Sequence, residues 1–129
     1  MSDAKTKITR VGHACYRIQT PGGKTLVIDP WITGNPSLAD PWMDLSQWSD
    51  TTHILATHGH FDHISGVAEL AKAVPTAQLI AQFEIVVHFL AQGLENVLPT
   101  NIGSTIDLGG GLKVSAVSAT HSSLSLIHI

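Results

Sequence analysis

The stretch His58-Gly59-His60-Phe61-Asp62-His63 places three histidines and one aspartate in six consecutive positions. Imidazole and carboxylate groups are the ligands that zinc and neighbouring transition metals accept in proteins. Residues two apart in an extended segment point to the same side, so His58 and His60 can hold one ion together. The stretch therefore predicts a metal site.

The flanking sequence predicts that this stretch is a loop between a strand and a helix. Residues 52–57 are short, apolar and rich in β-formers, which is typical of a buried strand, and residues 65–74 favour a helix that ends at Pro75. Asp62 and His63 then fall where the chain turns into the helix and are better placed for a second ion, or for a bridge between two ions. Alternatively, Asp62 caps a helix that begins at Ile64 or Ser65, which is compatible with metal binding.

The rest of the chain predicts a mixed sheet covered by helices on one side, because strands come first and then alternate with helices. Further strands are expected at residues 8–11, 15–19, 25–29, 78–81 and 112–120, and a further helix at residues 83–92. Residues 30–50 form a long irregular connection with three prolines and three tryptophans. We expect Trp31, Trp42 and Trp48 to cover the core and not to bind a ligand.

Composition limits the class of protein. Hydrophobic residues make up 43% of the 129 positions and charged residues 13%, against about 25% charged in a typical domain. The net charge is -3 and there is no run of Lys or Arg, so a nucleic-acid partner is not expected. A single cysteine excludes an internal disulfide, and neither a signal peptide nor a membrane span is recognisable. We therefore expect a cytoplasmic protein that acts on a small molecule. The composition does not indicate its oligomeric state.

The motif after its apolar strand resembles the signature of the metallo-β-lactamase superfamily of metal-dependent hydrolases. The segments Ile8–Tyr16 and Leu26–Trp31 are similar to the small bacterial branch related to ascorbate-phosphate lactonase. The resemblance extends to about Ser123. It implies an α/β fold in which this chain forms the N-terminal half of an αββα sandwich, a mixed sheet with helices on one face.

The resemblance also implies the ligands. One ion would be held by His58, His60 and the later His121, which follows the expected strand 112–120. A second ion would be held by Asp62 and His63 together with a bridging aspartate and a final histidine that lie outside this chain. We expect one or two Zn²⁺ ions, and Mn²⁺, Fe²⁺ or Ni²⁺ also suit these ligands.

Four further residues have more than one interpretation. Asp29, at a strand end, could accept the ring N–H of a ligand histidine and so orient it, or could simply begin a turn with Pro30. His13 lies in a Gly-His-Ala turn and is either a group close to the substrate or metal ligands, or a plain turn histidine. We expect His53 and His88 to be structural.

The ligands predict a mechanism. A metal-bound hydroxide would attack an ester, lactone or related small-molecule bond, and Asp62 would orient it and carry its proton. The alternatives are a phosphodiesterase of the same fold, or an inactive metal-binding half domain.

The domain prediction follows from the same resemblance. Residues 1–123 are expected to be the N-terminal portion of a single metallo-hydrolase domain, truncated and with little or no activity alone. Residues 124–129 match the translation of a sequencing-library adapter and are expected to be a non-native tail.

Overall fold

The computed structural model describes residues 4–120 of the chain. The expected ligand His121 and the expected non-native tail at 124–129 lie outside these residues.

A six-stranded sheet forms the centre of the fold, with strands in the order β1-β2-β3-β4-β5-β6. The strands are β1 (Lys7–Gly12), β2 (Cys15–Gln19), β3 (Thr25–Ile28), β4 (His53–Leu55), β5 (Gln78–Gln82) and β6 (Val97–Thr100). The pairs β1·β2 and β2·β3 are antiparallel, whereas β3, β4, β5 and β6 are parallel neighbours. The predicted mixed sheet is therefore confirmed.

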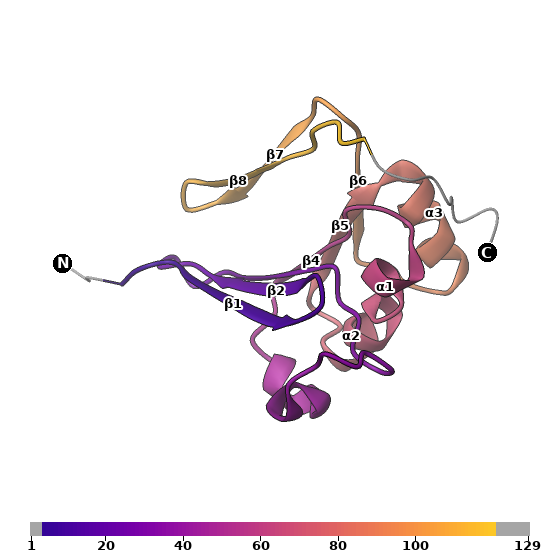
Figure 1. The fold of residues 1–129 in the computed structure, drawn as a ribbon. Coiled ribbons are helices and arrows are strands. Elements are labelled where there is room, and N and C mark those ends of the chain that lie inside the picture. Colours follow the sequence, from indigo (N-terminus) through magenta and orange to yellow (C-terminus); the bar gives the residue numbers. More distant parts are fainter. Residues whose placement is uncertain (1–3, 121–129) are drawn as a thin grey trace.

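The helices α1 (Phe61–Ile64), α2 (Val67–Ala73) and α3 (Phe83–Ala91) cover one face of this sheet (Figure 1). Val27, Ile54 and Leu79 project from successive strands into the core, where they meet side chains such as Leu70 and Phe89 from the helices. These five side chains are almost wholly removed from water. Burial of apolar surface at about 25 cal/mol per Å² is the main force that holds the helices on the sheet.

The long connection between β3 and β4 is ordered by an ion pair and by aromatic packing. It contains the short 3₁₀ helices η1 (Asp40–Met43) and η2 (Leu45–Trp48). Arg17 of β2 donates a hydrogen bond of 2.5 Å from Nη2 to Asp50, and its guanidinium lies 4.5 Å from the ring centre of Trp42. Trp48 is fully buried and Trp42 packs against the core, so the prediction that these two tryptophans cover the core is confirmed.

The opposite face of the sheet is approached by a separate hairpin, β7 (Thr105–Gly109) and β8 (Leu112–Ser115) (Figure 1). A cavity of about 310 Å³ lies between the six-stranded sheet and this hairpin. It is lined by residues such as Ile28, Leu55 and Ile80 of the sheet and Val114 of the hairpin. Within residues 4–120, no helix is long and apolar enough to cross a membrane.

Several element boundaries differ from the prediction. The helix expected at 65–74 is α2, which begins two residues later than predicted, at Val67. The separate short helix α1 precedes it within the motif and was not predicted. The strand expected at 112–120 ends at Ser115. β6 was not predicted because it contains Pro99, which cannot donate to a sheet and is tolerated here at the sheet edge.

Candidate metal centre

The histidine motif lies at the carboxyl end of β4, beside the end of β3. These two strands are parallel, with Ile28 paired to Leu55, and the amide of Asp29 continues the ladder with a hydrogen bond of 2.8 Å to the carbonyl of Leu55. The carboxyl ends of parallel neighbours meet at one edge of a sheet. Residues that follow β3 and β4 are therefore brought together there.

His58 and His60 present ring nitrogens to each other. Nε2 of His58 lies 3.0 Å from Nδ1 of His60, and the ring centres are 4.7 Å apart. Two nitrogens that bind one zinc ion at 2.0–2.1 Å in a tetrahedral arrangement lie about 3.3 Å apart. The spacing of these two donor atoms therefore suits a shared transition-metal ion, in agreement with the extended geometry expected from the sequence.

Asp62 and His63 belong to the first turn of α1, which begins inside the motif. The N-cap position is occupied by His60, and no side chain caps the helix. The alternative in which Asp62 caps a helix starting at Ile64 or Ser65 is therefore wrong, because that helix starts earlier. The helical turn places the His63 ring 4.0 Å from the ring of His58.

Asp62 is held between two histidines. Its Oδ2 lies 2.8 Å from Nε2 of His13 and 3.5 Å from Nε2 of His63. Burial raises the pKa of Asp62, but the hydrogen bond from His13 and the electrostatic influence of the neighbouring His63 and His13 rings together outweigh burial and hold the pKa below its ordinary value. The carboxylate is consequently ionised at neutral pH, the form that binds metal.

Asp29 is buried beneath the motif and lies in contact with it. Its Oδ1 accepts a hydrogen bond of 2.7 Å from the amide of Thr57, and its Oδ2 accepts one of 2.6 Å from the Thr57 hydroxyl. Nδ1 of His63 lies 2.7 Å from the same Oδ2. Asp29 thus has the contact expected of a residue that orients a ligand histidine.

Backbone strain also marks this region. Among residues 4–120, His13 (φ 56°) and Asp29 (φ 50°) are the two non-glycine residues with positive φ. Such conformations cost free energy and cluster at functional sites, where the surrounding structure enforces them. Asp29 directly follows β3, and its left-handed backbone conformation turns the chain away from the strand direction. Its carboxylate contacts Thr57 and His63 of the adjacent segment.

Two sets of donor atoms lie within 4.8 Å of one another, namely those of His13, Asp62 and His63 and those of Asp29, His58 and His63. The structure therefore brings together the motif, the β1–β2 turn and the residue after β3. His121 lies outside the described residues, so its distance from this cluster stays a prediction.

Sequence reasoning assigned Trp31 to the core and left it out of the site, and it did not consider Thr57. The ring of Trp31 meets His13 edge-on at 5.3 Å and Phe61 at 5.5 Å, so this tryptophan borders the site, unlike Trp42 and Trp48. Its position two residues after Asp29 was the available signal. Thr57 directly precedes the motif and touches both Asp29 and His58.

The other two histidines considered for the site lie apart from it. His53 is buried, with Nδ1 at 2.9 Å from the hydroxyl of Thr52, and His88 is exposed on α3 beside Gln92. Neither takes part in the two clusters of donor atoms.

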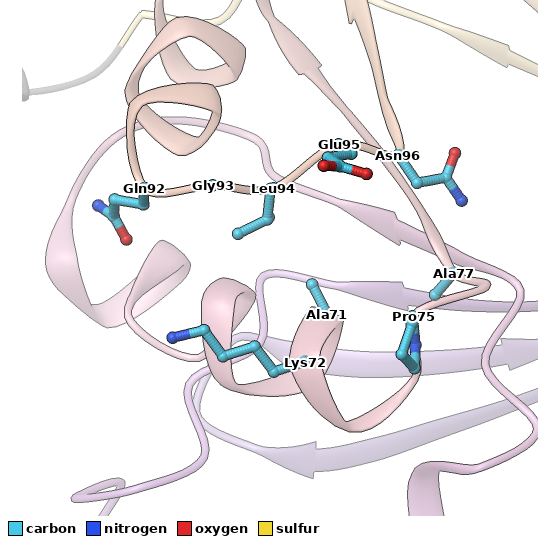
Figure 2. Close-up of a pocket in the computed structure, with 9 residues that line it drawn as sticks. All are labelled: Ala71, Lys72, Pro75, Ala77, Gln92, Gly93, Leu94, Glu95 and Asn96. Carbon is cyan, nitrogen blue, oxygen red and sulfur yellow. The ribbon is translucent and has the colours of Figure 1, made fainter.

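A pocket of about 420 Å³ lies at the opposite ends of the strands from the motif (Figure 2). It is lined by Lys72 near the end of α2, by Pro75 just after that helix, and by Glu95 and Asn96 just before β6. Because it lies at the amino ends of β5 and β6, it is remote from the motif at the carboxyl end of β4. It contributes nothing to the candidate metal centre.

The mixed sheet, the helices on one face and the clustered donor atoms at the ends of β3 and β4 can now be compared with known proteins. The Metallo-beta-lactamase superfamily profile matches residues 8–127. The chain belongs to the metallo-β-lactamase superfamily, as its motif predicted.

The curated relatives carry the name UPF0173 metal-dependent hydrolase. One from Rubrobacter xylanophilus is 42% identical over 118 residues, which is 92% of this chain and 47% of that protein. One from Mesorhizobium japonicum is 43% identical over 120 residues, covering 91% of this chain and 48% of the relative. The chain therefore spans about half the length of the curated relatives it matches.

Solved structures give the same picture. Igni18, a metallo hydrolase from the archaeon Ignicoccus hospitalis, matches with a TM-score of 0.77 and 29% identity, over 93% of this chain and 51% of Igni18. A metallo-beta-lactamase from Cronobacter sakazakii matches with a TM-score of 0.59 over 83% of this chain and 51% of its own, but at 18% identity it shows the fold alone.

Proposed function

We propose that this chain carries the first part of the active site of a zinc-dependent hydrolase that cleaves an ester, lactone or related small-molecule bond. The observation that supports it most is the approach of Nε2 of His58 to Nδ1 of His60, 3.0 Å apart, beside His63 and Asp62. The names of the relatives, metal-dependent hydrolases, support the reaction class.

The donor set divides between two ions in this proposal. His58 and His60 would hold one ion together with His121, and Asp62 and His63 would contribute to a second. A bound divalent cation lowers the pKa of a coordinated water and so supplies a nucleophile at neutral pH.

The roles of the surrounding side chains follow from their contacts. The carboxylate of Asp62 accepts the proton of the attacking water and passes it to the leaving group. His13 holds Asp62 in place through the contact between its Nε2 and Oδ2 of Asp62. Asp29 holds the ring of His63 with Nδ1 toward the protein and Nε2 toward Asp62.

A small substrate suits the surface beside the site. Trp31 and the exposed Phe61 form an apolar edge next to His13, against which the hydrocarbon part of an ester or lactone can pack. The net charge of -3 and the lack of a basic run in the sequence do not favour a polyanionic nucleic acid.

The test is a substrate comparison with the full-length protein and metal counted per chain. We expect zinc to be bound and simple p-nitrophenyl esters and lactones to be cleaved faster than bis(p-nitrophenyl) phosphate. Asp62→Ala should reduce hydrolysis by about 10²–10⁴-fold, because it removes the proton-transfer group, while the ion at the histidine site stays bound. Unchanged turnover in this variant, preference for the phosphodiester, or no bound metal would each overturn the proposal.

A second measurement concerns the 129 residues alone. We expect them to bind zinc with little or no hydrolysis, because the bridging aspartate and final histidine implied by the family are not in this chain. Turnover by this chain at the full-length rate would contradict that part of the proposal.

A further inference from the structure

Thr57 connects the buried carboxylate of Asp29 to the first histidine of the motif. Its hydroxyl oxygen lies 2.6 Å from Oδ2 of Asp29 and 2.9 Å from Nδ1 of His58. The same Oδ2 lies 2.7 Å from Nδ1 of His63. One carboxylate oxygen is thus linked to two histidine rings, directly to one and through a hydroxyl to the other.

The donor and acceptor roles in this chain of contacts are determined by elementary chemistry. An ionised carboxylate only accepts hydrogen bonds, so the Thr57 hydroxyl must donate its single proton to Asp29. Its oxygen can then only accept from His58, which requires the proton of a neutral His58 ring to be on Nδ1. The lone pair is consequently on Nε2, the nitrogen that faces His60.

The same reasoning applies to His63. Its Nδ1 must donate to Asp29, so the lone pair of the neutral ring is on Nε2, the nitrogen that lies 3.5 Å from Oδ2 of Asp62. Both rings therefore present the lone pair toward the donor atoms of the candidate metal centre.

We propose that Thr57 is a positioning residue that relays the effect of Asp29 to His58, so that one buried carboxylate sets the tautomer of two metal-binding histidines. This inference rests on the proposed metal site. A metal ligand must offer a lone pair, and a ring held in the correct tautomer binds without first moving its proton. The relay therefore raises the metal affinity of both His58 and His63.

The chain contains a matched comparison for this arrangement. Thr52 and His53, one strand-length earlier, repeat the same pairing, because Nδ1 of His53 lies 2.9 Å from the Thr52 hydroxyl, which donates to the carbonyl of Thr25. That pair lies at the start of β4, away from the motif. Thr52→Val therefore removes an equivalent hydroxyl without touching the relay.

The tautomers are measured by two-bond ¹⁵N–¹H correlation of ¹⁵N-histidine in the metal-free full-length protein. We expect the proton on Nδ1 for His58 and for His63. Thr57→Val should move the His58 proton toward Nε2 and leave His63 unchanged, while Thr57→Ser should restore the wild-type pattern. Thr57 is exposed, so its replacement leaves no cavity. Thr52→Val should affect His53 alone.

Asp29→Asn gives a second, independent readout. The amide can donate to the Thr57 hydroxyl, which frees that hydroxyl to donate to His58, so both His58 and His63 should change tautomer. A response of His63 alone would overturn the relay, as would an unchanged His58 in Thr57→Val.

Zinc affinity, measured by competition with a chromogenic chelator, should fall about 10- to 100-fold in Thr57→Val and stay close to wild type in Thr57→Ser and Thr52→Val. Equal affinity in Thr57→Val would contradict the proposal. If the wild-type protein binds no zinc, the proposed function fails, whereas the tautomer measurements in the metal-free protein still decide the relay.

Discussion

Oδ2 of Asp29 lies 2.7 Å from Nδ1 of His63, although the two residues are 34 positions apart in the sequence. The contact exists because β3 and β4 are parallel neighbours whose carboxyl ends share one edge of the sheet. Asp29 leaves β3 in a left-handed conformation and is almost fully buried. The orientation of a histidine in the motif thus depends on the correct pairing of two strands.

Replacing Asp29 should weaken metal binding. In Asp29→Asn the side chain keeps its shape but loses the charge that holds His63, and we expect zinc affinity to fall about 10- to 100-fold, the usual cost of losing a partner of a metal ligand. Zinc titration of the full-length protein measures this.

Asp50→Asn is the matched control for that change. Asp50 also accepts several side-chain hydrogen bonds, from Arg17, Gln19 and Thr25, but it lies away from the motif. We expect it to lower the melting temperature without changing zinc affinity. An equal loss of affinity in both variants would mean that general destabilisation, and not the contact with His63, is responsible.

Gly66→Ala should disturb both stability and the site. A Cβ at Gly66 would lie 2.6 Å from the carbonyl oxygen of Pro30 and 3.1 Å from the amide nitrogen of Ile32, and these backbone atoms cannot move without shifting the segment that carries Asp29. We expect a loss of about 1–3 kcal/mol in the free energy of unfolding, together with weaker zinc binding.

Gly22→Ala serves as the control for that prediction, since a Cβ there meets nothing within 4 Å. It should leave the denaturation midpoint and the zinc affinity close to wild type. A Gly66→Ala protein as stable as Gly22→Ala would show that the close approach of Gly66 to Pro30 is not needed.

His53 should make the protein less stable as the pH falls. Burial of its ring, and secondly the positive charge of Lys24, lower the pKa of His53 below 6.5 in the folded state. Between that lowered pKa and 6.5 the unfolded chain binds the proton more readily than the folded one, so the free energy of unfolding decreases as pH falls through this window. Above about pH 7 the contribution is constant.

The measurement is the melting temperature of the full-length protein between pH 7.5 and 5.5 in excess chelator. His53→Asn, which keeps a polar atom near Thr52, should show a shallower decrease than wild type. The exposed His88→Asn variant should keep the wild-type dependence. Identical slopes for wild type and His53→Asn would contradict this assignment.

The sequence predicted those parts of the fold and site that depend on local pattern. The strands around Val27, Ile54 and Leu79 follow from short apolar runs, and α3 follows from its periodicity and the glycine after it. The motif by itself indicated a metal and the family, and the family is confirmed. β6 was not predicted, because its four residues show little alternation of apolar and polar side chains and include a proline, which disfavours a strand. Pairing with β5 makes this segment a strand.

For the candidate site, too, the local features could be predicted from the sequence and the long-range contacts could not. The residue types of the motif and the extended backbone from His58 to His60 are local, so the sequence alone indicated that these two rings share a face. The contacts of His13 with Asp62, of Asp29 with His63 and of Trp31 with His13 join segments distant in the chain. Only the tertiary structure decides them, because they depend on strand pairing and on left-handed turns enforced by packing, which no local propensity encodes.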